Sequence, residues 1–199
     1  MTHHPENDPA DTPEVRELFG VIASCYPSAS GFSGVVVRSV NTKYATASDF
    51  FSGVGASKSG GRWNRKGLEA TYTSLDIETA IKEAYQNLLH YGFPISNIRP
   101  RTTAGARVKL KKVLDITVPA ILRKIGFKTK DLVIEDWRAI QLADEESWTQ
   151  SIGRACFFAG FEGLIVPSAR NPRGKNLVMF PSNFTKSSVL EILGKEDLR

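Results

Sequence analysis

Residues 74–91, "SLDIETAIKEAYQNLLHY", constrain the fold more than any other segment because their spacing is that of an amphipathic helix. Ser74 can cap this helix, and Asp76 and Glu78 favour its first turn. The preceding run "EATYTS" (69–74) has the pattern of a short strand, so helices and strands must share one core. We expect the helix to pack through one apolar face, made by Ile77, Ile81, Ala84, Leu88 and Tyr91.

Further strands are predicted where β-branched or apolar runs are bounded by turn residues. They lie at 32–40, 106–117, 162–169 and 175–181. The turn sequence "RNPRG" separates the last two runs, which predicts a hairpin.

Helical spacing recurs over 14–26, and residues 118–130 have the pattern of a short helix and turn. Residues 136–161 also have helical character, which is strongest over 146–159. The Ser-, Gly- and Asn-rich segment 41–67 has the pattern of a loop. Strands and helices do not alternate regularly, so we predict an α+β fold, a compact single domain with a mixed sheet and helices.

The chain of 199 residues begins with a polar, proline-rich stretch, "MTHHPENDPADTP". We expect residues 1–13 to be a disordered lead-in and residues 14–199 to form one domain. The sequence contains neither a signal-peptide pattern nor an apolar run of membrane-spanning length. We therefore expect a cytoplasmic protein with no membrane partner.

Histidine and cysteine usage excludes several classes of enzyme. Two of the three histidines lie in the lead-in, which leaves His90 for the domain. That is too few for a histidine-ligated zinc site, and a Ser-His-Asp or Cys-His site would have to use His90. Cys25 and Cys156 stand apart, outside any metal-type motif, and we expect both to be buried free thiols.

A net charge of +5 is concentrated partly in two loops, "SGGRWNRKG" (59–67) and "SARNPRGKN" (168–176). Basic loops suit a phosphate-bearing ligand or nucleic acid, although a solvated basic surface gives the same composition. The glycines match neither a P-loop nor a Rossmann fingerprint. The amides of Gly60 and Gly61 and the fork of Arg62 could still bind an anion, with Trp63 as an apolar anchor.

Single residues in these segments have ordinary interpretations. Helical geometry places Glu83 beside Lys82 and Gln86, away from the apolar face, as a solvated acid. Tyr72 fits a strand packing residue, and Ser168 and Asn176 fit a hairpin.

The combination is more specific. "SGGRWNRKG", "ATYTSLDIETAIKEAYQ" and "GFEGLIVPSARNPRGKNLVMF" resemble, in this order, the RES-domain family, which comprises toxins of bacterial toxin–antitoxin pairs. The resemblance implies an ADP-ribosyltransferase-like fold and an activity that consumes NAD. The segment "NTKYATASDFFSGVGASK" departs from the family pattern, so the first arginine is placed through the strand at 32–40. The family's site residues then correspond to Arg38, Arg62, Tyr72, Glu83, Ser168 and Asn176.

NAD as a substrate gives these residues roles. The resemblance implies that Arg38, Arg62 and the amides of Gly60 and Gly61 bind the diphosphate, and that Tyr72 stacks on the nicotinamide. Ser168 and Asn176 complete the NAD site. Glu83 would stabilise the positive charge that develops on the ribose, as in glycoside cleavage, and no metal is required.

The expected function is therefore an NAD-consuming toxin that cleaves the nicotinamide–ribose bond by hydrolysis or phosphorolysis. A protein ADP-ribosyltransferase, which would modify a protein acceptor, could use the same site. A basic nucleic-acid-binding module without catalysis is the second alternative. The resemblance also implies an Xre-type helix-turn-helix antitoxin. An acidic tail of that partner would be steered to a basic cleft mouth formed by Arg38, Arg62, Arg65 and Lys66.

Overall fold

Six strands form one mixed sheet in a computed structural model that describes residues 8–90 and 100–198. The pairings run β1–β2–β5–β4–β3 and return to β1, because β3 also pairs with β1, while β6 lies on the other edge of β3. The β3–β4 pair is parallel and the other pairs are antiparallel. The strands are β1 (Ser30–Asn41), β2 (Thr71–Ser74), β3 (Arg101–Asp115), β4 (Gly163–Pro167), β5 (Lys175–Met179) and β6 (Val189–Ile192).

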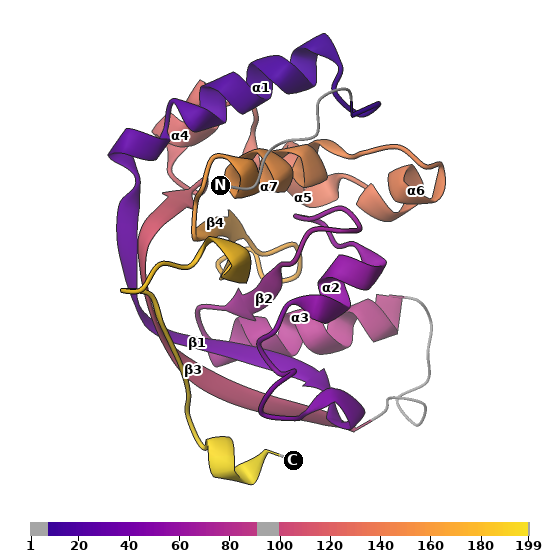
Figure 1. The fold of residues 1–199 in the computed structure, drawn as a ribbon. Helices are drawn as coiled ribbons and strands as arrows, with labels where there is room; N and C mark the ends of the chain where they lie inside the picture. Colours follow the sequence, from indigo (N-terminus) through magenta and orange to yellow (C-terminus); the bar gives the residue numbers. More distant parts are fainter. Residues whose placement is uncertain (1–7, 91–99, 199) are drawn as a thin grey trace.

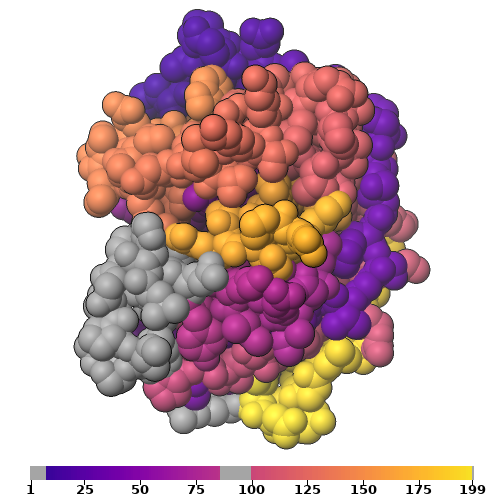
Figure 2. All heavy atoms as spheres, turned by 180° about the vertical axis from the view of Figure 1, so that it is seen from behind, coloured from indigo at the N-terminus to yellow at the C-terminus, as the bar shows by residue number. Residues whose placement is uncertain are grey.

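Helices cover the sheet on two sides (Figure 1). α1 packs against α7 at one end of the molecule, and α3 lies against β1 and β2. Seen from behind, the segment from β4 to β5 lies between the α4–α6 region and α3 (Figure 2). The helices are α1 (Pro13–Ala23), α2 (Val54–Ser59), α3 (Ile77–His90), α4 (Pro119–Lys124), α5 (Thr129–Ile134), α6 (Trp137–Leu142) and α7 (Trp148–Phe158).

β1 and β3 form a long curved ribbon that crosses the whole molecule (Figure 1). Their register runs from Ser30 opposite Val113 to Asn41 opposite Arg101. Because the strands are antiparallel, the last residues of β1 and the first residues of β3 meet at one end. Arg38 and Arg101 are thus brought close together although they are far apart in sequence.

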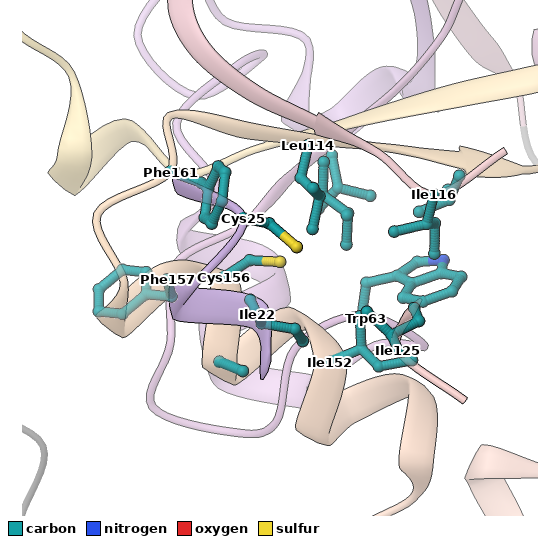
Figure 3. Close-up of a cluster of buried hydrophobic side chains, with 14 of the residues drawn as sticks. Ile22, Cys25, Trp63, Leu114, Ile116, Ile125, Ile152, Cys156, Phe157 and Phe161 are labelled. Carbon is teal, nitrogen blue, oxygen red and sulfur yellow. The ribbon is translucent and has the colours of Figure 1, made fainter. Parts of the chain in front are cut away.

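The larger of two buried apolar clusters lies between α1, α7 and the sheet, and it contains Trp63, Cys25 and Cys156 (Figure 3). Both cysteines are free and no more than 1% exposed, which confirms the prediction of buried thiols. Burial raises the pKa of the Cys156 thiol well above its usual range. Trp63 is 3% exposed, so its loop is anchored in the core as expected.

The predicted mixed α/β architecture is confirmed, and so is the hairpin formed by β4 and β5. Three elements were not predicted. The segment expected to be a loop contains the short helix α2, a second short helix, α5, follows the one expected over 118–130, and β6 adds a strand after the last predicted one.

The predicted apolar face of the 74–91 helix was wrong. Ile77 is 61% exposed and Ile81 is 46% exposed, whereas Thr79 and Ala80 are buried. Asp76 caps the helix by accepting hydrogen bonds from the Thr79 amide (2.7 Å) and hydroxyl (2.8 Å), so Ser74 is not the cap. The side chains of Leu88 and His90, and the whole of Tyr91, lie outside the described residues.

Part of the lead-in is packed rather than disordered. Arg154 is fully buried and forms ion pairs with Asp11 (2.7 Å), Glu146 (2.6 Å) and, more distantly, Asp8 (3.6 Å). Asp8 also pairs with Arg65, and this interaction lowers the pKa of the Asp8 carboxyl to about 2. These ion pairs tie residues 8–12 to α7 and to the loop at 59–67, while residues 1–7 lie outside the described part.

Arg154→Met should lower the free energy of unfolding by about 3–5 kcal/mol, because it leaves buried carboxylates without their cation. Urea unfolding at pH 7 measures the loss. Arg16→Met is the matched control, since Arg16 is exposed on α1. Equal stability of the two variants would contradict a structural role for the buried ion pairs.

Candidate functional site

A cavity of about 350 Å³ opens between β1, β2, α3, α6 and the turn that follows β4. Positive charge predominates in its lining. Among the described residues that line it, Glu83 is the one carboxylate, whereas the arginines number five: Arg38, Arg62, Arg101, Arg138 and Arg170. Such a lining suits a ligand that carries several negative charges.

Glu83 points into the protein, and two side chains hold its carboxylate. Its Oε1 accepts a hydrogen bond from Ser168 Oγ (2.5 Å) and another from Asn176 Nδ2 (3.0 Å). Asn176 is itself oriented by Ser74, whose hydroxyl donates to Asn176 Oδ1 (2.8 Å). The carboxylate therefore has a single preferred position at the cavity wall.

Ser168 is arranged so that it can only donate toward Glu83. Its Oγ accepts hydrogen bonds from the amides of Arg170 (3.1 Å) and Asn171 (2.9 Å), so its one hydrogen is directed at the carboxylate. Ser168 is 4% exposed and stands behind Glu83 rather than at the cavity surface. Its geometry is that of a positioning residue.

Arg62 is fixed by the C-terminal end of α5. Its Nη1 donates to the carbonyl oxygens of Leu132 (2.8 Å) and Glu135 (3.0 Å). These bonds use two of the five N–H groups, so a bidentate contact with a phosphate would use Nη2 and Nε. Burial is the main cause that lowers the pKa of Arg62, which nonetheless remains a cation at neutral pH.

Gly60 and Gly61 line the cavity, but their amides do not face a ligand as expected. The Gly60 amide donates to the Ala56 carbonyl and the Gly61 amide to the Asn64 carbonyl, both at 2.8 Å. The glycines act instead through backbone shape and space. Gly60 has a φ of +72°, and a Cβ on Gly61 would collide with the Tyr72 hydroxyl.

The hydroxyl of Tyr72 holds the loop that carries Arg62. It accepts from the Trp63 amide (2.8 Å) and donates to Asn64 Oδ1 (2.7 Å). Asn64, 1% exposed, in turn donates to the carbonyls of Ala56 and Leu68 (both 2.9 Å). Burial raises the pKa of Tyr72 above its usual range, so the phenol stays protonated.

All eight residues predicted for the site lie around one place. Seven line the cavity and Ser168 supports Glu83 from behind. Two of the basic residues expected at the cleft mouth do not belong there: Arg65 pairs with Asp8, and Lys66 lies beside it in a separate hollow. Sequence reasoning missed the residues that complete or support the site: Asn64, Ser74, Arg101, Arg138, Arg170 and Asn171.

Asn64 lies in the stretch "SGGRWNRKG" (59–67), on which the family resemblance partly rests, so that stretch could have drawn attention to it. Arg101 begins a strand far from every motif, so no sequence signal pointed to it. The described residues contain no group of three or more His, Cys, Asp or Glu that could hold a metal ion. Nor does that part of the chain include a helix with the length and apolar character needed to cross a membrane.

The fold and the site together define an α/β protein with an arginine-lined pocket, in which hydrogen bonds hold a single carboxylate in place. The family model of the RES domain matches residues 35–197, and the chain therefore belongs to the RES domain family.

Two kinds of relative give this assignment detail. The NAD(+) phosphorylase MbcT, from Mycobacterium bovis and from Mycobacterium tuberculosis, is 27% identical over 132 residues. That match spans 61% of this chain and 62% of the relatives' length. The crystal structure of the M. tuberculosis MbcT-MbcA toxin-antitoxin complex is similar in fold, with a TM-score of 0.68, 22% identity and 88% coverage of each chain.

Tyr72→Phe should lower the free energy of unfolding by about 1–3 kcal/mol, because the Trp63 amide and Asn64 Oδ1 both lose the Tyr72 hydroxyl as a hydrogen-bond partner. Thermal or urea unfolding measures the effect, and Tyr44→Phe, at a side chain that is 56% exposed, is the control. A variant as stable as the control would show that the loop does not depend on this hydroxyl.

Proposed function

We propose that this protein cleaves the nicotinamide–ribose bond of NAD, with phosphate as the preferred acceptor. The observation that carries the proposal is the carboxylate of Glu83, held by Ser168 and Asn176 in an otherwise cationic cavity. The name of the MbcT relatives, NAD(+) phosphorylases, supports this choice of reaction.

The geometry suits the charge changes of that reaction. Bond cleavage builds positive charge on the ribose, and a fixed carboxylate stabilises it without having to reorganise. The surrounding arginines, Arg62 foremost, would bind the phosphates of the dinucleotide. The ring of Tyr72 lines the cavity and would stack on the nicotinamide, while its hydroxyl stays engaged in the loop. Nicotinamide leaves as a neutral molecule, so no general acid is needed.

Hydrolysis of NAD and transfer of ADP-ribose to a protein would use the same machinery and differ only in the acceptor. A nucleic-acid-binding protein would not need this arrangement. The arginines would help it to bind a phosphate backbone, but a carboxylate fixed among them would repel that backbone.

Glu83→Gln should reduce NAD consumption by about a hundredfold or more while NAD binding is retained, because the change removes only the charge that faces the developing cation. Purified protein is incubated with NAD, with and without inorganic phosphate, and nicotinamide, ADP-ribose and ADP-ribose 1-phosphate are quantified. Labelled NAD with cell lysate tests for transfer to protein. Glu78→Gln is the matched control on α3, since Glu78 is exposed and pairs only with Lys82 (2.6 Å) in the described structure.

Near-normal turnover by Glu83→Gln would remove Glu83 from the mechanism. Product formed equally with and without phosphate would favour hydrolysis, and labelled protein would favour transfer.

We further propose that the chain is the toxin of a toxin–antitoxin pair with an Xre-type helix-turn-helix antitoxin. A similar fold occurs in a solved toxin–antitoxin complex, MbcT-MbcA, which supports a toxin role. The physical requirement is an inhibitor that reaches the cavity, and an acidic tail of the partner would be attracted by Arg62, Arg138 and Arg170.

Expression of the chain alone should therefore arrest growth, and expression of Glu83→Gln should not. Co-expression with the product of a neighbouring antitoxin gene should restore growth, and the purified partner should block NAD turnover. Growth counts and cellular NAD content are the measurements. A wild-type chain that accumulates in soluble, folded form without harming cells would contradict the toxin role.

A further inference from the structure

The cations of the cavity fall into two groups. Arg62, Arg138 and Arg170 come from the 59–67 loop, from α6 and from the turn before β5, and the charges of Arg138 and Arg170 act on Arg62. Arg38 and Arg101 come from β1 and β3, and the charge of Arg101 acts on Arg38. The family resemblance assigned Arg38 to the diphosphate together with Arg62, but the structure groups Arg38 with Arg101 instead.

Ser39, the residue that follows Arg38, holds the side chain of Arg101 in place at the cavity. Arg101 Nη2 donates to the Ser39 carbonyl (2.5 Å) and Arg101 Nε to the Ser39 hydroxyl (3.1 Å). The β1–β3 ladder fixes the two backbones, since Arg38 lies opposite Ala104 and Asn41 opposite Arg101. Both side chains line the cavity, and Arg101 is near enough to Arg38 to repel its guanidinium group.

Arg38 carries a buried donor that the described residues do not satisfy. Its Nη1 is fully buried and has no hydrogen-bond partner among them. Neither Arg38 nor Arg101 lies within ion-pairing distance of a carboxylate in that same part of the chain. A buried donor of a cation that has no partner is costly, and Nη1 of Arg38 lies at a cavity that an anion can enter.

The electrostatics of the pair agree with that geometry. Burial, followed by repulsion from Arg101, lowers the pKa of Arg38 to about 10. Arg38 is still protonated at neutral pH, and a bound oxyanion would relieve both effects at once.

We propose that Arg38 and Arg101 form a second phosphate-binding subsite, separate from the subsite at Arg62, so that the cavity binds two phosphate groups together. This inference rests on the proposed function and adds the residues that would hold its acceptor. Two neighbouring guanidinium groups suit one small oxyanion, whereas the set of three arginines, Arg62, Arg138 and Arg170, suits a longer diphosphate.

The chemistry of the acceptor follows from that placement. An oxygen of inorganic phosphate attacks the ribose carbon, the C–O bond forms, and the C–N bond breaks with its electron pair leaving on nicotinamide. The product is ADP-ribose 1-phosphate. Two guanidinium groups would orient the phosphate and reduce its repulsion from Glu83.

The test compares Arg101→Gln with Arg107→Gln, a change on the same strand at an exposed arginine that pairs with Glu191 away from the cavity. For Arg101→Gln we expect the KM for inorganic phosphate to rise about tenfold to a hundredfold, which corresponds to the loss of one charge-assisted hydrogen bond. The KM for NAD should change less than about twofold, and Arg107→Gln should match the wild type.

The outcomes separate the possibilities. A raised KM for NAD with an unchanged KM for phosphate would mean that the pair binds a phosphate of the dinucleotide and would overturn its assignment to the acceptor. Unchanged values for both substrates would overturn the subsite itself. Should Arg101→Gln fold poorly, Ser39→Ala removes only the hydroxyl contact that orients Arg101 and should raise the same KM to a smaller extent.

Binding measurements keep the inference independent of turnover. Inorganic phosphate and ADP-ribose are titrated separately into wild type, Arg101→Gln and Arg62→Lys by calorimetry. Weaker phosphate binding by Arg101→Gln together with intact ADP-ribose binding supports the subsite even if no NAD is consumed. If the wild-type protein binds phosphate no better than Arg101→Gln does, the subsite is contradicted, whatever the outcome of the NAD assay.

Discussion

The position of the Glu83 carboxylate is the constraint on which the site depends. Among the described residues that line the cavity, Glu83 is the one acid beside five arginines. Ser168 and Asn176 give it two donors from the β4–β5 hairpin, and these donors in turn are oriented by backbone amides and by Ser74. Because Glu83 is on α3 and its partners lie in the turn after β4 and on β5, the packing of α3 against β1 and β2 is what brings these groups together.

That packing is secured by polar contacts rather than by the apolar stripe that periodicity suggested. Thr79 is fully buried, accepts a hydrogen bond from Asn171 Nδ2 (2.8 Å) and donates to Asp76. With Thr79 and Ala80 turned inward, Glu83 follows on the same helical face, one turn further along. Ile77 and Ile81 are left at the surface, so a pattern that counts only apolar residues selects the wrong side of this helix.

The 59–67 loop shows a second limit of reasoning from composition. Gly60 and Gly61 were correctly placed at the cavity, but their amides were assigned to a ligand, whereas they bind Ala56 and Asn64. The loop is instead held by Asn64 and the Tyr72 hydroxyl, whose side-chain hydrogen bonds reach partners no more than nine positions away in sequence. Motif spacing can identify such residues as a set, but it cannot tell which one contacts a ligand and which one holds the loop.

The sequence by itself determined the mixed α/β class, the main strands, the hairpin, the buried thiols and the set of residues that meets at the cavity. These depend on local patterns of apolarity and turn residues, and on motifs short enough to be recognised in order. Only the tertiary structure decided which face of α3 is buried, that Ser168 stands behind Glu83, and that Arg101 joins Arg38. Those outcomes depend on strand register and on hydrogen bonds between residues about 60 to 90 positions apart, where local sequence carries no information about the partner.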